Sequence, residues 1–167
     1  MTVLNCTLKL SKRIPFPMIE SNFQPTNILG QWSGNTFNLG KFPFIILTNE
    51  LTLLSVVISL KDVHSFWVRF LNSLQRLLGQ LQIPSRQIEH EMHSMAEVTF
   101  TRKTNRSTLG SMNDLVHMVR AIVGQEAETN LDAINLELSE VVSLTLKEVY
   151  PRDAVHRAFD RLPPEWN

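Results

Sequence analysis

The sequence predicts an α+β fold in which a mostly antiparallel sheet of about five strands packs against helices. Three observations predict this class. Short apolar segments separated by turn residues recur over 31–60, as in an antiparallel meander. A long segment with apolar residues at helical spacing follows over 62–81, which is typical of an amphipathic helix. An alternating segment at 97–101 then returns the chain to the sheet.

The strands are expected at 2–10, 32–39, 42–47, 51–60 and 97–101. The first alternates imperfectly between apolar and polar residues, which is typical of an edge or half-buried strand. Residues 53–58 are almost continuously apolar. They are expected to form a central strand covered on both faces, or one covered by helices on one side and by the early loop on the other. Three prolines over 11–30 predict a long loop or a short helix that lies over the core.

The helices are expected from Asp62 to 81, over 85–93, from Ser107 or Ser111 to Gly124, over 131–149, and from Pro151 to the Pro163-Pro164 pair. Each carries apolar residues every three or four positions. Polar N-cap residues begin several of them, and glycine or proline residues end them.

Two parts of the chain are distinguished by this pattern. Residues 1–124 are expected to form an α+β core domain, and 125–167 a helical C-terminal extension that packs on the core or is used in association. The apolar residues over 131–149 lie near heptad spacing, so this helix could pair with a copy of itself as a homodimer. Packing on the domain is the favoured alternative, because most amphipathic helices do so.

Composition narrows the class of protein. The chain has 167 residues, of which 43% are hydrophobic, enough for one domain with a substantial core. Sixteen basic residues balance sixteen acidic ones, so the strong positive field of a dedicated nucleic-acid binder is absent. The single cysteine, Cys6, cannot form an internal disulfide, which favours a reducing, cytoplasmic location. No signal peptide or membrane span is expected.

Common catalytic motifs are missing from the sequence. It contains no glycine-rich phosphate loop, dinucleotide fingerprint, zinc-protease motif, hydrolase elbow or cysteine pair. We therefore assign no catalytic residue, metal or cofactor. His90 and His93 could face a metal from one helix, but a third ligand is not evident, and surface histidines are favoured. Cys6 could be a nucleophile beside a histidine, but a buried core thiol is favoured.

Residues 101–114 form the most distinctive polar segment. It combines three basic side chains, among them Arg106, with hydroxyl and amide groups, and it leads directly into a helix. The unpaired N–H groups and positive dipole of a helix start could hold a phosphate or carboxylate here. Alternatively, the segment's serines and Asn113 only cap the helix. If the loop that follows the strand at 97–101 faces the edge of the strand at 32–38, Asn35 and Arg106 would share one pocket.

Four segments together resemble a prokaryotic domain family of unknown function. They are Asn5-Cys6-Thr7-Leu8-Lys9-Leu10, residues 29–35, residues 47–53, and Asn105-Arg106-Ser107-Thr108-Leu109-Gly110-Ser111-Met112-Asn113-Asp114. The resemblance covers approximately residues 2–123 and departs at Leu8, where a second basic residue would be expected. It implies a site built from Thr7, Lys9, Trp32, Asn35, Asn49, Thr52, Arg106, Ser107 and Asn113.

The function expected from these observations is that of a small intracellular binding or regulatory protein, which holds an anionic ligand or a partner at a polar site near Arg106. An alternative is an enzyme acting on nucleotide or nucleic-acid phosphate. In that case Arg106 and Lys9 would stabilise phosphate charge, and His117 or Asp114 would act as acid or base. A third reading is single-stranded nucleic-acid binding through the aromatic residues Trp32, Phe42 and Phe44.

Overall fold

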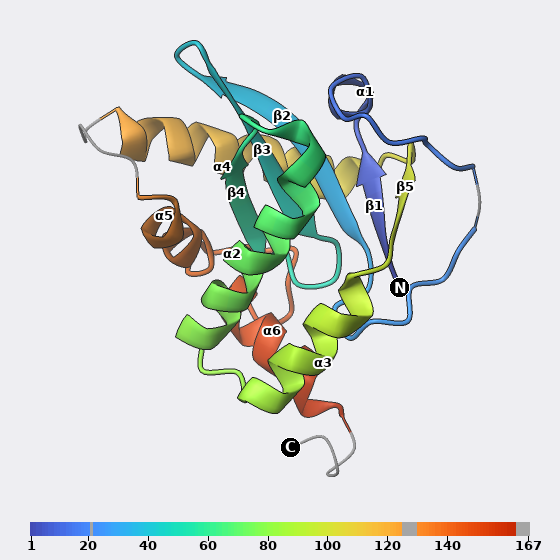
Figure 1. Cartoon of the computed structure of the whole chain (residues 1–167). Coiled ribbons are helices and arrows are strands. Elements are labelled where there is room, and N and C mark those ends of the chain that lie inside the picture. Colours follow the sequence, from blue (N-terminus) through green and yellow to red (C-terminus); the bar gives the residue numbers. More distant parts are fainter. Residues whose placement is uncertain (21, 125–129, 163–167) are drawn as a thin grey trace.

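One mixed sheet organises the chain. A computed structural model describes residues 1–20, 22–124 and 130–162, and its five strands lie in the order β4-β3-β2-β1-β5 (Figure 1). They are β1 (Thr2–Cys6), β2 (Trp32–Leu39), β3 (Phe42–Asn49), β4 (Ser55–Ser59) and β5 (Val98–Thr101). β1 pairs in parallel with β2 and β5, and β3 is antiparallel to β2 and β4. The α+β class and the β2–β3–β4 meander are confirmed, while the two parallel pairs make the sheet mixed.

Helices cover both faces of the sheet. They are α1 (Leu8–Ser11), the short 3-10 helix η1 (Val63–Ser65), α2 (Phe66–Gln80), α3 (Ser85–Met95), α4 (Arg106–Val123), α5 (Leu131–Leu138) and α6 (Pro151–Asp160). In Figure 1, α2 and α3 lie in front of the sheet, α4 behind it and α5 beside β4. One apolar cluster joins the sheet to α2, α3 and α6, and a second joins it to α4 and α5. Among the described residues, no helix is long and apolar enough to cross a membrane.

The first strand differs from the prediction in length and position. An edge or half-buried strand is expected over 2–10, but β1 ends at Cys6, lies between β2 and β5 and is buried along its whole length. Thr7 ends it, because its hydroxyl accepts a hydrogen bond from Leu10 N and so begins α1. The helical turn buries Leu10 over Gly34, where a Cβ atom would lie only 2.7 Å from Leu10 Cδ2. Glycine at 34 therefore permits α1 to pack on β2.

The apolar strand after the second turn is an edge strand rather than a central one. β4 covers only Ser55–Ser59 of the expected 51–60, and it has a single strand neighbour. Its two faces are nevertheless both covered, as its continuous apolar character predicts, because they contribute to the two apolar clusters. Its outer edge is covered by Asn135 of α5, whose Oδ1 accepts a 2.8 Å hydrogen bond from Val57 N. Asn135 Nδ2 also donates to Val57 O at 3.4 Å.

The C-terminal part is less helical than the apolar spacing predicts. The helix expected over 131–149 ends at Leu138, and the next helical segment is α6, which begins at Pro151 as predicted. Ser139 ends α5: its hydroxyl donates to Leu136 O, and its carbonyl accepts from Arg152 N. Ile134 and Leu138 are buried in the second apolar cluster, so the expected packing on the domain is confirmed for them. A homodimer through this segment, and the division at 124, remain predictions.

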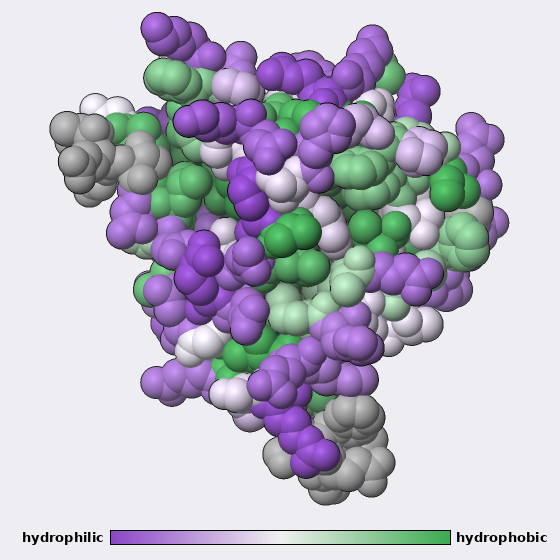
Figure 2. All heavy atoms as spheres, in the orientation of Figure 1, coloured by the Kyte–Doolittle hydropathy of each residue, from purple (hydrophilic) through white to green (hydrophobic). Residues whose placement is uncertain are grey.

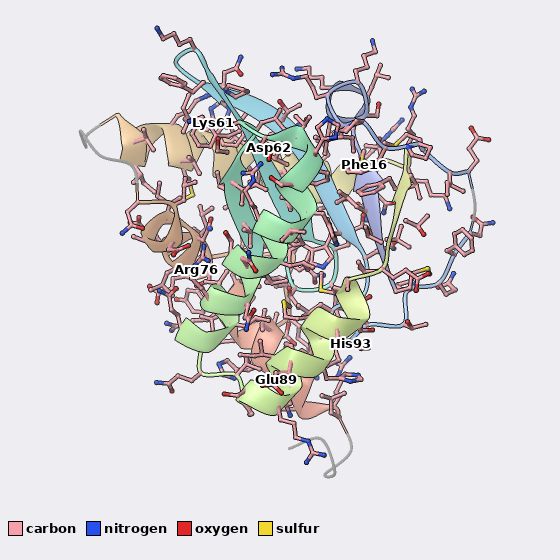
Figure 3. All side chains as sticks on the ribbon, viewed as in Figure 1. Phe16, Lys61, Asp62, Arg76, Glu89 and His93 are labelled. Atoms are coloured by element: carbon pink, nitrogen blue, oxygen red, sulfur yellow. The ribbon has the colours of Figure 1, made fainter. Side chains whose placement is uncertain are left out.

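The remaining helices agree closely with the sequence. Asp62 (Figure 3) accepts a hydrogen bond from His64 N and begins η1, which leads into α2. α3 and α4 lie where they were expected, but Asn105 caps α4 in place of Ser107 or Ser111, and its side chain accepts from Thr108 N. The expected end of α6 at 163–164 and the expected boundary at 125–129 lie outside the described residues.

The proline-rich segment over 11–30 packs on the core without a helix of its own beyond α1. Phe16 (Figure 3) stacks on Phe100 of β5, with ring centroids 5.0 Å apart. Further along, the buried carboxylate of Glu91 in α3 accepts hydrogen bonds from Ile28 N at 2.7 Å and Leu29 N at 3.0 Å. Burial raises the pKa of Glu91, and these donors oppose that rise. Glu91 thus holds the segment before β2 against α3 through these hydrogen bonds.

Candidate functional site

A cleft opens where β2 continues past the end of β1. The last registered pair of these strands is Cys6 with Gly34, and β2 runs on to Leu39. The turn of α1 lies on one side of this exposed part of β2, and α4 lies on the other. Together they enclose a cleft of about 600 Å³. It lies beyond the carboxyl end of β1 and beside the part of β2 that continues past it.

The cleft is strongly basic, and we call it the basic cleft. Its charged lining consists of Lys9, Lys12, Arg13 and Arg120, together with His117. No aspartate or glutamate lines it, and within 1–20, 22–124 and 130–162 none of these side chains forms an ion pair. Figure 2 shows hydrophilic side chains along the upper rim of the molecule, over α1 and the end of the β2–β3 hairpin. An anion here would meet several cations and no competing carboxylate.

Asn35 presents a fixed amide donor to the basic cleft. Its Oδ1 accepts hydrogen bonds from Thr7 Oγ1 at 2.8 Å and from Thr36 N at 2.9 Å. Both donors hold the oxygen toward the protein, so the amide orientation is determined. No described residue accepts a hydrogen bond from Asn35 Nδ2, and Asn35 lines the cleft. An amide N–H pair fixed in this way is suited to an oxygen acceptor on a ligand.

The structure brings together four of the nine residues that the sequence implicated. Lys9, Asn35 and Asn113 line the basic cleft, and Thr7 orients the Asn35 amide through a hydrogen bond to its oxygen. Arg106 and Ser107 are exposed in the first turn of α4 and are not among the residues that line the cleft. The lining begins two turns further along α4, at Asn113.

The other three predicted residues are buried. Trp32 packs edge-on against Phe70, with ring centroids 5.0 Å apart. Asn49 organises the turn after β3: its Oδ1 accepts from Thr52 N and Thr52 Oγ1, both at 2.9 Å. Asn49 Nδ2 donates to Leu29 O at 2.7 Å. These contacts give Asn49 and Thr52 a structural role in the turn after β3, and they tie that turn to the loop before β2.

Sequence reasoning missed the residues that give the cleft most of its charge. Lys12 and Arg13 lie in a proline-containing segment that carries no local signal of a site. One signal was available for the α4 side, because Asn113, His117 and Arg120 follow one another at helical spacing and form a polar stripe on the predicted helix. A buried polar network was missed too: Asn5 Nδ2 donates to Glu50 Oε1 at 2.8 Å.

The structure does not bring together the acid–base, nucleophile and metal-binding groups that the sequence suggested. Asp114 and His117 line different clefts, so they do not converge on one ligand. Cys6 is buried, and its burial raises the pKa of the thiol to about 12, far from that of a reactive nucleophile. His93 lies on α3 (Figure 3), and the described part of the chain contains no group of three or more potential metal ligands.

Comparison with known proteins identifies a family without an assigned activity. No curated protein and no solved structure matches this chain. A family profile with the description "Domain of unknown function (DUF6933)" matches residues 3–154. The match includes the whole sheet except Thr2, the first residue of β1, and every residue of the basic cleft. Because the profile covers most of the sequence, the chain belongs to the DUF6933 family of domains of unknown function.

Proposed function

We propose that this protein is a binding module that holds a phosphate-bearing or other anionic small molecule in the basic cleft. The observation that carries the proposal is the lining of the cleft, where Lys9, Lys12, Arg13 and Arg120 converge without a carboxylate. Charge-assisted hydrogen bonds from lysine and arginine side chains are the strongest that a protein offers to an oxyanion. The site differs from the one expected at Arg106, but the class of ligand is the same.

Two further observations support binding of an anion at this place. The fixed Asn35 amide adds a neutral donor among the cations, which suits an oxyanion with several acceptor oxygens. The net charge of the chain is zero, so the excess positive charge is local to the cleft. A local patch of this kind suits a small anion better than a long polyanion, whose binding needs an extended basic surface.

The lone buried thiol of Cys6 fits the proposal of an intracellular, reducing location, since it has no partner for a disulfide. We propose the cytoplasm of a prokaryote, in agreement with the family resemblance.

The proposal is tested by calorimetric titration of the protein with inorganic tripolyphosphate at low salt. The double variant Lys12→Ala/Arg13→Ala is expected to weaken binding at least about tenfold, since each lost charge-assisted bond contributes roughly 1.5–3 kcal/mol. The matched control is Arg86→Ala/Lys147→Ala, which removes two exposed positive charges away from the cleft and is expected to bind like the wild type. Absence of wild-type binding, or equal losses in both double variants, would contradict the proposal.

A further inference from the structure

A second hollow adjoins the basic cleft at the end of the β2–β3 hairpin. It has a volume of about 430 Å³, and its apolar lining is made by Leu39, Phe42, Phe44 and Val123. We call it the aromatic hollow. Gly40, with a φ of +61°, forms the hairpin turn beside it, where a residue with a side chain would be strained. The hollow therefore lies between the hairpin and the last turn of α4.

The aromatic hollow and the basic cleft are continuous. Asn38 and Arg120 line both of them. The Arg120 guanidinium donates to Asn38 O from Nε and from one terminal nitrogen, both at 3.4 Å. These bonds tie the guanidinium to the hairpin at the boundary of the two spaces. A ligand that occupied both would pass a planar cation that can contact a phosphate or an aromatic ring.

Phe42 supplies an open aromatic face in the hollow. Its side chain is 62% exposed, although most phenylalanine side chains are largely buried. Its neighbour Phe44 is held in place by stacking on Phe37, with centroids 5.9 Å apart and planes inclined by 28°. Lys41 Nζ lies 5.9 Å from the Phe42 ring centroid and adds a cation beside it. An exposed ring next to fixed aromatic and cationic groups suits a planar heterocycle.

We propose that the ligand is a nucleoside phosphate, with its base on Phe42 in the aromatic hollow and its phosphates in the basic cleft. This inference rests on the proposed function, because it assigns the ligand class of the same site. Spaces of about 430 and 600 Å³ match a small-molecule site, for which roughly 300–1,000 Å³ is common. The zero net charge favours a mononucleotide over a nucleic-acid strand.

The experiment compares a ligand that has a base with one that lacks it. Each of the four common ribonucleoside triphosphates and inorganic tripolyphosphate is titrated into the full chain by calorimetry in magnesium-free buffer. At least one nucleotide is expected to bind about 10-fold more tightly than tripolyphosphate, as one base–aromatic stack provides. Phe42→Ala is expected to abolish this preference and to leave tripolyphosphate binding unchanged. Phe23→Ala, which removes another exposed phenylalanine ring that lines neither the aromatic hollow nor the basic cleft, is the matched control and should keep the preference.

The outcomes separate this inference from the function on which it rests. If every nucleotide binds no better than tripolyphosphate, and Phe42→Ala changes nothing, the nucleotide inference is overturned while the anion site stands. If tripolyphosphate and the nucleotides all fail to bind, both fail. A thymidine oligonucleotide is titrated as a third probe. If it binds far more tightly than any mononucleotide, with a steep loss on adding salt, the ligand is a single strand and the mononucleotide assignment is wrong.

Discussion

Thr7 donates a 2.8 Å hydrogen bond from its hydroxyl to Oδ1 of Asn35, and the same hydroxyl oxygen accepts from Leu10 N. One side chain therefore begins α1 and orients the amide of the neighbouring strand. Because Lys9, Lys12 and Arg13 are carried by α1 and the residues after it, Thr7 couples the position of these cations to that of the Asn35 donor. The basic cleft is built around this contact.

Replacement of Thr7 by valine tests this coupling. Thr7→Val keeps the shape of the side chain but removes its hydroxyl, so it should lower the free energy of unfolding by about 1 kcal/mol, as loss of an N-cap does. It should also weaken tripolyphosphate binding, since the Asn35 amide is no longer held. Urea unfolding and calorimetry measure the two effects. Thr7→Ser retains the hydroxyl and should behave like the wild type. A valine variant of unchanged stability would show that the hydroxyl does not cap α1.

The buried carboxyl of Glu91 should make stability depend on pH. Burial raises its pKa in the folded protein, so the folded state holds this proton more tightly than the unfolded state. The resulting stabilisation is complete below the ordinary glutamate pKa and is lost as the pH rises through the raised value. Glu91→Gln cannot titrate, and its amide nitrogen would face an N–H donor of Ile28 or Leu29.

The glutamine variant should therefore be less stable than the wild type by roughly 1–3 kcal/mol, with the deficit largest at acidic pH and smaller toward neutral pH. Urea unfolding of both proteins from pH 4 to pH 8 measures the deficit. Glu89→Gln changes an exposed residue of the same helix and controls for the charge. A deficit that grows as the pH rises would mean that the donors to the carboxylate, which are Ile28 N, Leu29 N and Asn27 Nδ2, outweigh burial and lower its pKa.

Cys6 should be unreactive while the protein is folded. Its side chain is 1% exposed, and its pKa is raised to about 12. At pH 8 this rise alone lowers the thiolate fraction roughly a thousandfold relative to an ordinary cysteine. Labelling with a thiol-specific chromogenic reagent should be very slow in native buffer and rapid in denaturing urea. Rapid labelling in native buffer would contradict the buried position of β1.

Asn135 should contribute to stability through the edge of the sheet. Asn135→Ala would leave the buried N–H of Val57 without an acceptor, which costs roughly 1–3 kcal/mol. Chemical unfolding measures the loss. Glu137→Ala, at an exposed position of the same helix, serves as the control and should change stability little. Equal stability of the two variants would show that the side chain of Asn135 does not pair with β4.

Local patterns in the sequence predicted elements well and their arrangement poorly. α2 could be predicted because its apolar spacing begins at Asp62 and stops before Pro84, and both signals lie within the segment. The position of β1 could not be predicted, since its neighbours β2 and β5 are set by pairing with distant residues. The apolar spacing over 139–149 led to a wrong prediction for a similar reason, because Ser139 O accepts a hydrogen bond from Arg152 N, thirteen residues further along the chain, where the helix ends.

The difference between local patterns and tertiary arrangement also explains which residues of the candidate site could be predicted. Lys9, Asn35 and Asn113 were implicated through motifs, and they do lie together. Trp32, Asn49 and Thr52 belong to the same motifs, but they are buried in the core and in a turn. A match to a motif does not by itself separate residues that hold the fold from residues that contact a ligand. Lys12 and Arg13 join the cleft only through tertiary packing, which no local pattern reports, whereas Arg120 belongs to the polar stripe on α4.

The central place of β1 has a consequence for the order in which the protein can fold during synthesis. Asn5 pairs with Thr101 of β5, whereas its other neighbour, Ser33 of β2, follows soon after it in the chain. As the chain leaves the ribosome, β1 can join the meander early, but its second side stays open until residues 98–101 have emerged. Such distant pairing slows folding. We expect the nascent chain to present an unpaired strand for most of its synthesis, the stage at which a chaperone would shield it from aggregation.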